Sequence, residues 1–265
     1  MIKEIPRIVR QLPDGATAMY AWFQAMHTRV DILLRHTGPA ACDLMQRAID
    51  EMREVIASLE QAGNCFSPGS ELFRLNHLNV GERMELSPAL FDILSECIRY
   101  QRLTEGLFDV SVDAACHRGG MLPYLDLRDD HTASRLIADI TLNLSGFLKG
   151  YALDRMREVV KQHGIHDALL NMGNSSIMSL GDVPFHLKNG CLTTSGNTTG
   201  HPSHIINPRS GQYVQGERSV TVVTDDGTDG EVASTVMFIC QPEEKERLMS
   251  VLNVRSFTEN LPEKL

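Results

Sequence analysis

The stretch of residues 39–62 carries apolar side chains at helical spacing and follows directly on two short stretches with strand character. Its apolar positions are Met45, Ala48, Met52, Val55 and Leu59, and Gly63 ends the pattern. In residues 20–23 aromatic side chains dominate, and in 29–34 apolar residues alternate with less apolar neighbours, as is typical of strands. A long amphipathic helix that follows two strands predicts a mixed α+β chain with one continuous core.

The remaining elements follow the same rules of periodicity and capping. Ser87 followed by Pro88 is typical of a helix start, because serine caps the first turn and proline is favoured at the first helical position. Further helices are predicted at residues 87–106, 148–163, 232–239 and 243–252. Further strands are predicted at 140–144, 168–172, 176–180, 192–194, 205–206 and 219–224, and a loop at 119–132. The 265 residues contain no repeat and no long linker, which favours one large domain or two packed lobes.

The composition argues against several classes of function. The net charge is −9 and the pI is near 5.6, whereas nucleic-acid phosphates require basic patches. The six cysteines form no Cys-x-x-Cys pair, which argues against a zinc site or a disulfide framework. No apolar run is long enough to span a membrane, and residues 1–6 contain neither a signal core nor a lipidated cysteine. From the residues alone we expect a soluble cytoplasmic protein, in which a metal ion could help to hold a phosphorylated ligand.

Residues 142–154 contain the most informative segment for chemistry. A predicted strand ends at Ser145 and Gly146, and a predicted helix begins with Lys149 in its first turn. Small residues allow a ligand to approach the backbone, and a helix N-terminus with a lysine attracts anions. On this segment alone, an ordinary strand–helix turn with a solvated lysine is the favoured interpretation.

Three later segments offer polar groups that could line a cleft. Residues 171–176 place Gly173 after a strand, and residues 193–197 are a run of hydroxyl donors that includes Ser195 and Gly196. His204 precedes a short apolar strand and could act as a general base near neutral pH. Taken singly, a hairpin turn, a polar loop and a structural histidine explain the same residues.

Glu231 and Thr235 are candidate ligands for Mg²⁺. They lie four residues apart in a predicted helix, so both oxygens project from one face. A carboxylate and a hydroxyl are hard oxygen ligands, and Mg²⁺ fills its other positions with water and phosphate oxygens. The alternative is a capped helix start with an acidic first turn.

In their order along the chain and in their residue sequences, these segments resemble the ApbE-type family, the FAD:protein FMN transferases. The resemblance runs from about Phe23 to the last helix. Seven elements carry it, namely Met26-His27-Thr28, residues 70–76 (SELFRLN), residues 104–112 (TEGLFDVSV), Lys149 to Asp154 (KGYALD), Thr194-Ser195-Gly196, His204 to Gly211, and Ala233-Ser234-Thr235.

The resemblance implies a fold, an activity and a set of site residues. Residues 1–22 would be an N-terminal lead-in, and 23–265 one ApbE-like α+β domain of two packed lobes with an FAD cleft between them. The carbonyl of Gly146, with Glu231 and Thr235, would hold Mg²⁺ beside the FAD pyrophosphate. The cleft would be lined by Met26, Phe108, Asp109, Gly173, Ser195 and Gly196.

The implied reaction moves FMN from FAD to a threonine or serine of an acceptor protein through a phosphoester and expels AMP. Lys149 and His204 would lie near the phosphates, with His204 a candidate for deprotonating the incoming hydroxyl. Metal-assisted stabilisation of the developing charge suits this chemistry.

The sequence also differs from the family pattern at several positions. Asn143 and Glu231 stand in place of aspartates, and His27, Ser145 and Asn174 in place of glycines; the stretch between Leu180 and Thr193 is shorter than usual. Two alternatives therefore stay open. One is a catalytically degenerate relative that binds flavin or acts as a scaffold, and the other is a Mg²⁺-dependent FAD pyrophosphatase that releases FMN and AMP.

Two further expectations concern location and self-modification. Family members usually act outside the cytoplasmic membrane, so the resemblance predicts an exported or periplasmic protein, in contrast to the residues themselves. Residues 14–17 resemble the Gly-Ala-Thr core of acceptor sites, which raises self-flavinylation at Thr17 as a hypothesis. A turn that leads into the first strand explains the same residues more simply.

Overall fold

The computed structural model of the protein describes residues 5–111, 124–138, 141–197 and 204–260. Its largest element is an eight-stranded sheet with the strand order β1-β2-β3-β7-β8-β9-β12-β13. The strands are β1 (Arg7–Gln11), β2 (Thr17–Ala25), β3 (Thr28–His36), β7 (Asp167–Met172), β8 (Ser176–Leu180), β9 (Gly190–Asn197), β12 (Arg218–Thr224) and β13 (Ser256–Asn260). All neighbouring strands in this sheet are antiparallel.

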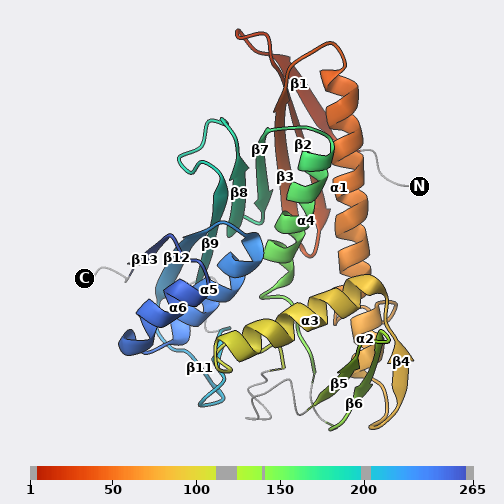
Figure 1. The fold of residues 1–265 in the computed structure, drawn as a ribbon, viewed down its shortest axis with the longest axis vertical. Coiled ribbons are helices and arrows are strands. Elements are labelled where there is room, and N and C mark those ends of the chain that lie inside the picture. Colours follow the sequence, from red (N-terminus) through yellow and green to blue (C-terminus); the bar gives the residue numbers. More distant parts are fainter. Residues whose placement is uncertain (1–4, 112–123, 139–140, 198–203, 261–265) are drawn as a thin grey trace.

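Three helices cover one face of this sheet (Figure 1). Helix α1 (Ala41–Gly63) packs on β2 and β3, α4 (Leu148–Gln162) on β7 and β8, and α5 (Gly227–Ile239) on β9 and β12. The buried side chains of β3 alternate along the strand, with Val30, Ile32 and Leu34 fully buried. Because alternate strand residues point to one face, this pattern places the core between the sheet and the helices.

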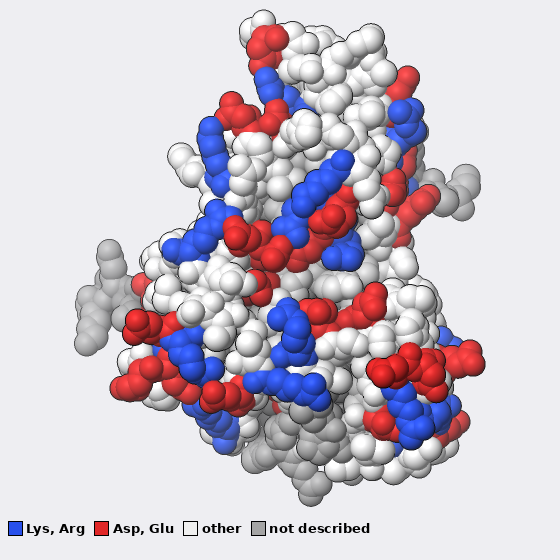
Figure 2. Space-filling view, in the orientation of Figure 1, with Lys and Arg blue, Asp and Glu red and all other residues white. Residues whose placement is uncertain are grey.

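A smaller unit lies at one end of the sheet. It contains α2 (Glu71–Asn76), α3 (Pro88–Leu103) and a three-stranded sheet of β4 (Arg83–Glu85), β6 (Thr132–Arg135) and β5 (Leu125–Arg128). The hydrophobic core runs on without a break from the large sheet into this unit. The predicted α+β fold with one continuous core is therefore confirmed. Acidic and basic side chains intermingle on the face that Figure 2 shows.

The remaining elements are short. Strands β10 (Ile206–Asn207) and β11 (Gln212–Tyr213) form a two-stranded sheet. A 3-10 turn, η1 (Pro242–Glu244), leads into α6 (Lys245–Val251). No helix among the described residues combines the length and the apolar character that crossing a membrane requires.

Most of the predicted elements are confirmed, with the three longest helices and the hairpin of β7 and β8 in their predicted places. Helix α5 begins at Gly227, five residues before the predicted start at 232, because a partner helix caps its first turn, as described below. Residues 243–252 hold a shorter helix than predicted.

The predicted loop at 119–132 is wrong for its described part, since residues 125–128 form β5 and Thr132 begins β6. These strands have four residues each, too few for a clear alternation, and they are stabilised by pairing with each other and with β4. Residues 119–123 lie outside the described part.

The predicted strand at 140–144 is also wrong over residues 141–144, and residue 140 lies outside the described part. Leu142 pairs both of its backbone groups with the side chain of Asn76, and the Asn143 N–H donates to the Val110 carbonyl. Among the described residues no strand pairs with residues 141–144, so their alternating pattern does not produce a ladder there.

The N-terminal residues assigned to a lead-in contain β1 and most of β2, which pair with each other and with β3 in the main sheet. The domain boundary after residue 22 stays a prediction. Thr17 is only 5% exposed at the start of β2 and donates a hydrogen bond to Gln11, so its hydroxyl is poorly placed for self-modification.

Candidate active site

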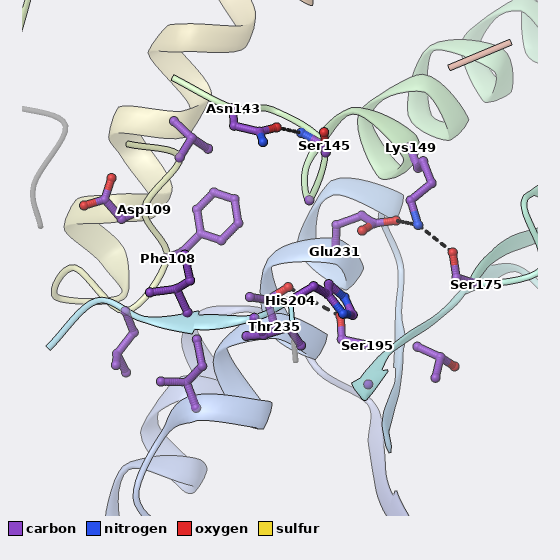
Figure 3. Close-up of a pocket in the computed structure, with 18 of the residues that line it drawn as sticks. Phe108, Asp109, Asn143, Ser145, Lys149, Ser175, Ser195, His204, Glu231 and Thr235 are labelled. Atoms are coloured by element: carbon purple, nitrogen blue, oxygen red, sulfur yellow. Dashed lines mark hydrogen bonds and ion pairs between the residues drawn. The ribbon is translucent and has the colours of Figure 1, made fainter. Parts of the chain in front are cut away.

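A cavity of about 910 Å³ lies between the large sheet with α5 on one side and the segments after α3 on the other. Figure 3 shows most of its lining side chains. All of the predicted site residues except Met26 line it, namely Phe108, Asp109, Gly146, Lys149, Gly173, Ser195, Gly196, His204, Glu231 and Thr235. The structure therefore brings together residues that are far apart in the sequence, while their individual roles stay predictions.

Glu231 is the most deeply buried charged group of the cavity wall, at 4% exposure. Its Oε1 accepts a short hydrogen bond from the Ser176 hydroxyl and lies 3.6 Å from the ammonium nitrogen of Lys149. Burial raises the pKa of Glu231, against the opposing effects of the Lys149 charge and the Ser176 hydrogen bond. Within the described part of the chain, the hydrogen bond from Ser176 and the ion pair with Lys149 both involve Oε1 of Glu231, which leaves Oε2 for a ligand.

Lys149 connects Glu231 to the start of β8. Its Nζ donates to the Ser175 hydroxyl at 2.5 Å, as Figure 3 shows, and it lies in the first turn of α4 as predicted. The lysine therefore offers one cation that is shared between a buried carboxylate and the open cavity. An anionic ligand in the cavity would meet this charge beside the N-terminus of α4.

Thr235 follows Glu231 by one helical turn on α5, and both residues line the cavity. The Ser195 hydroxyl of β9 lies 2.8 Å from the Ser234 hydroxyl and 3.4 Å from that of Thr235. Gly146 faces them from the loop before α4, where no atom would meet an added Cβ within 4 Å. A backbone carbonyl, a carboxylate and a hydroxyl thus border one cavity, a donor set that suits Mg²⁺.

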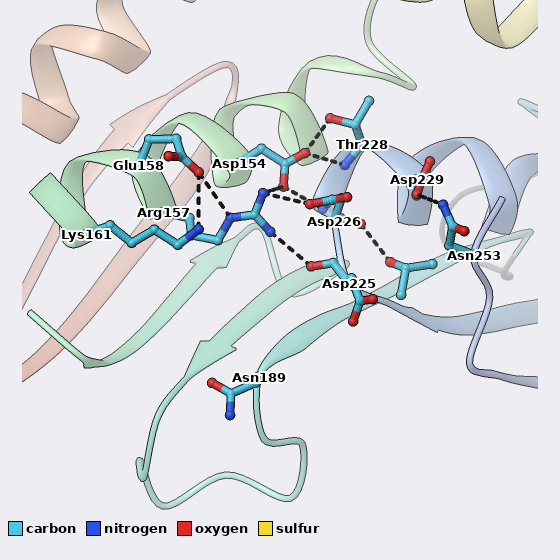
Figure 4. Close-up of polar contacts among 12 residues, drawn as sticks. Asp154, Arg157, Glu158, Lys161, Asn189, Asp225, Asp226, Thr228, Asp229 and Asn253 are labelled. Atoms are coloured by element: carbon cyan, nitrogen blue, oxygen red, sulfur yellow. Dashed lines mark hydrogen bonds and ion pairs between the residues drawn. The ribbon is translucent and has the colours of Figure 1, made fainter.

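Asp154 anchors the helix that carries Glu231 and Thr235 (Figure 4). Its carboxylate accepts hydrogen bonds from the N–H groups of Gly227 and Thr228, both at 2.8 Å, and from the Thr228 hydroxyl. Burial raises the pKa of Asp154, while these hydrogen bonds and the Arg157 charge act in the opposite direction. The sequence analysis placed Asp154 in a motif without giving it a role, since its partners lie more than 70 positions away in the chain.

The two helices also approach closely through glycines. A Cβ on Gly150 would lie 2.1 Å from the Gly227 carbonyl oxygen and 2.7 Å from Cγ of Glu231. A side chain at this position would therefore force α4 and α5 apart.

Aromatic side chains form the base of the opposite wall. The rings of Phe108, Phe147 and Tyr100 contact one another, with ring centroids 5.9 to 6.4 Å apart. Asp109 follows Phe108 into the cavity lining and accepts hydrogen bonds from the backbone and hydroxyl of Ser111. This wall offers an apolar surface next to a carboxylate.

One predicted site residue behaves differently from the rest. Met26 does not line the cavity, because it lies in the turn between β2 and β3 with a φ of 50° and packs against the hydrophobic core. His204 does line the cavity and is exposed. Sequence reasoning missed several lining residues, among them Leu107, Ile205 and Ile239, because apolar side chains carry no chemical signature in the sequence.

Comparison with known proteins places the chain in one family. The model of the ApbE family matches residues 26–257. An FAD:protein FMN transferase of Rhodobacter capsulatus is 28% identical over 244 residues, which are 73% of this chain and 46% of that protein. One of Chlamydia muridarum is 24% identical over 63% of this chain and 66% of that protein.

Solved structures with a similar fold also include ApbE proteins. The apo crystal structure of the flavinyl transferase ApbE of Pseudomonas stutzeri matches with a TM-score of 0.75 at 17% identity, over 97% of this chain and 94% of that one. The chain spans about half to two thirds of the length of the first two curated relatives. The family model nevertheless covers most of its residues, and the chain belongs to the ApbE family.

Proposed function

We propose that this protein is an FAD:protein FMN transferase that moves FMN from FAD to a threonine or serine hydroxyl of an acceptor protein. Family membership and the names of the relatives support the activity. The cavity supports the substrate, since its volume lies in the range of sites that hold cofactor-sized ligands. It combines an apolar wall at Phe108 with a polar wall at Lys149, which suits a flavin and its phosphates respectively.

The residues of the polar wall fit Mg²⁺. Glu231, Thr235 and the Gly146 carbonyl would hold the ion, with the free Oε2 of Glu231 as the anionic ligand. When bound, the ion would offset phosphate charge and stabilise the charge that develops on leaving AMP. Glutamate in place of the family's aspartate keeps the charge, and the Ser176 hydrogen bond holds one of its oxygens in place.

The protein's own residues supply the remaining functions. Lys149 and the N-terminus of α4 bind the pyrophosphate, and Phe108 packs against the apolar part of FAD. His204 accepts the proton from the acceptor hydroxyl, whose oxygen then bonds to the FMN phosphorus. The bond from that phosphorus to the bridging oxygen breaks, and AMP leaves with the electron pair. The products are a phosphoester-linked flavin and AMP.

One observation carries the proposal. Glu231 is a buried carboxylate that borders a large open cavity beside a lysine and a helix N-terminus, where burial raises its pKa. A buried carboxylate that borders an open cavity and has one oxygen available to a ligand is characteristic of a binding site for a cation or its complexes. A purely structural carboxylate would be satisfied at both oxygens.

The test is incubation of the protein with FAD and a threonine-bearing acceptor peptide, with Mg²⁺ in one set and EDTA in the other. We expect Mg²⁺-dependent AMP release in step with an FMN adduct on the peptide, measured by chromatography and intact mass. His204→Ala should lose most of the adduct, whereas His186→Ala, an exposed histidine outside the cavity lining, should retain it.

The other outcomes separate the alternatives. Free FMN and AMP in the absence of any adduct would establish a pyrophosphatase. FAD binding without AMP release, with several acceptor peptides, would contradict transfer and indicate a flavin-binding relative.

A further inference from the structure

Asn76, the last residue of α2, lies outside the cavity lining and is 7% exposed. Its amide nitrogen donates to the Leu142 carbonyl and its Oδ1 accepts from the Leu142 N–H, both at 2.9 Å. One side chain therefore makes both hydrogen bonds that a neighbouring strand would make to this residue. The function proposed above gives Asn76 no part.

The segment that Asn76 holds leads directly to the cavity. Leu142 is followed by Asn143, Ser145 and Gly146, all of which line the cavity, and then by the first turn of α4 with Lys149. The Asn143 side chain accepts from the Ser145 N–H at 3.0 Å, and the Phe147 N–H donates to the Leu144 carbonyl at 2.9 Å. These contacts are local, so they shape the turn without fixing where it lies relative to the rest of the protein.

Longer-range contacts of the segment are few among the described residues. The Asn143 N–H donates to the Val110 carbonyl at 2.7 Å, and the side chains of Leu142 and Leu144 are buried. Asn76 adds two hydrogen bonds from a distant part of the chain. Val110 follows Phe108 and Asp109 in the chain. Its hydrogen bond with Asn143 therefore also connects the lining segment 107–110 to the lining segment 143–146.

Asn76 is itself held firmly. Arg135 of β6 donates from one nitrogen to the Asn76 carbonyl at 2.6 Å and to the Leu78 carbonyl at 2.9 Å. The amide is therefore fixed to the small three-stranded sheet through its own backbone. Movement of the Gly146 loop away from this sheet would break two buried hydrogen bonds at once.

The chemistry requires a carboxamide. Leu142 presents one donor and one acceptor, and asparagine or glutamine offers a matching acceptor and donor on one planar group, whereas an ionised carboxylate only accepts. An aspartate can accept from the Leu142 N–H but leaves its carbonyl facing another oxygen. Glutamine would have to accommodate one more methylene in a buried site.

We propose that Asn76 is a positioning residue that fixes the Gly146 carbonyl and the start of α4 against the cavity by pairing with the backbone of Leu142. This inference rests on the proposed function, because it assigns Asn76 an effect on FAD and Mg²⁺ binding through the Gly146 loop.

The experiment compares Asn76→Asp with the wild-type protein and with Ile49→Val, a change at a buried position of α1 that lies far from residues 141–149 in the sequence. The control should lose as much stability as Asn76→Asp does. If Ile49→Val has the higher melting temperature of the two variants, the more disruptive Ile49→Ala takes its place. Three quantities are measured, namely FAD affinity with Mg²⁺ and with EDTA, the Mg²⁺ concentration for half-maximal FAD binding, and amide hydrogen exchange across residues 141–149 without ligand.

We expect Asn76→Asp to weaken FAD binding and raise the half-maximal Mg²⁺ concentration by about 10-fold, as for other residues that orient a metal ligand. Amide exchange at 142–148 should accelerate in this variant while α1 stays protected. The Ile49 variant should keep wild-type affinity, Mg²⁺ dependence and loop exchange.

Wild-type FAD affinity and loop exchange in a folded Asn76→Asp protein would overturn the inference and leave the proposed function intact. Equal losses in Asn76→Asp and the Ile49 variant would overturn it as well, since they would reflect stability alone. Absence of FAD binding by the wild-type protein would overturn the proposed function, and this inference with it.

Discussion

The two walls of the cavity are built in different ways. The helix wall is formed by Lys149, Ser175, Ser195, Glu231 and Thr235. Its side chains project from regular helices and strands, except for Ser175, which lies in the turn just before β8. The loop wall, formed by residues 107–110 and 143–146, consists of irregular backbone held by side chains from elsewhere, such as Asn76.

The difference shows which contacts fix the positions of the residues in each wall. On the helix wall, Asp154 and the contact of Gly150 with Gly227 set the spacing between α4 and α5. This spacing in turn sets the positions of the side chains that the two helices carry. On the loop wall, residues 107–110 and 143–146 belong to no strand ladder within the described structure, so each backbone group needs a partner of its own. Changes to the helix wall should therefore alter charge and stability, whereas changes to the loop wall should alter position.

Glu231→Gln should have the largest effect, since glutamine keeps the shape of the helix wall and removes its only buried negative charge toward the cavity among the described lining residues. We expect Mg²⁺-dependent AMP release to fall about 1000-fold, equivalent to about 4 kcal/mol of transition-state stabilisation. The melting temperature without ligand should stay the same or rise, because burial opposes the charge of Glu231. Glu243→Gln, at an exposed site, is the matched control. Near-normal activity in Glu231→Gln would contradict the assignment of the metal site.

Gly150→Ala should break the spacing of the helix wall. The added Cβ would lie 2.1 Å from a backbone oxygen, so α4 and α5 must separate. We expect a loss of about 3 kcal/mol in the free energy of unfolding, measured by chemical denaturation. Gly69→Ala, where no atom lies within 4 Å of the new Cβ, should be close to wild type. Equal stability of the two variants would show that the helices can adjust freely.

Asp154→Asn should weaken the anchor of α5 without changing its size. Asparagine directs at most one acceptor oxygen toward three donors, so buried N–H groups of Gly227 and Thr228 lose a partner. We expect a loss of about 2 kcal/mol in unfolding free energy. Mg²⁺-dependent FAD affinity should fall with it, because Glu231 moves with the helix. Glu158→Gln, on the exposed side of Arg157, is the control, and an equal effect there would argue against a specific anchor.

The pH dependence of stability provides a smaller test of the same carboxyl. Burial raises the pKa of Asp154 in the folded state above its value in the unfolded chain. The folded state therefore binds the proton more tightly, so the contribution of this group is greatest at low pH and is lost as pH rises through the folded pKa. The stability difference between wild type and Asp154→Asn should thus shrink from pH 4 toward neutral pH. If denaturation curves show a stability difference that grows with pH, the pKa of Asp154 is lowered on folding and this prediction is wrong.

Ser195→Ala should have the smallest effect. It removes an uncharged hydroxyl that lies 2.8 Å from the Ser234 hydroxyl and 3.4 Å from the Thr235 hydroxyl. We expect AMP release to fall about 5-fold, equivalent to about 1 kcal/mol. Ser179→Ala is the control, since the buried Ser179 hydroxyl has no hydrogen-bond partner in the described structure and its removal should be neutral or stabilising. A loss above 100-fold in Ser195→Ala would instead place this hydroxyl among the groups that contact the reacting atoms.

The sequence predicted the long elements well and the short ones poorly. Helix α1 and the hairpin of β7 and β8 have strong periodicity and clear turn residues, so local preference and tertiary packing agree. Residues 141–144 of the strand predicted at 140–144 have the right alternation, but no strand pairs with them in the described part of the chain. Strands β5 and β6 are too short to give a pattern. The start of α5 was missed because its cap comes from Asp154 on another helix.

By itself, the sequence determined which residues are candidates for chemistry and in what order they occur, because motif residues such as Lys149, Glu231 and Thr235 are distinctive in type and spacing. Only the tertiary structure decided that they border one cavity, that Met26 lies outside it, and that Asn76 and Asp154 hold its walls in place. The physical reason is the distance along the chain over which each interaction acts. Periodicity and capping act over a few neighbouring residues, whereas the hydrogen bonds that fix these walls join groups 66 and 73 positions apart.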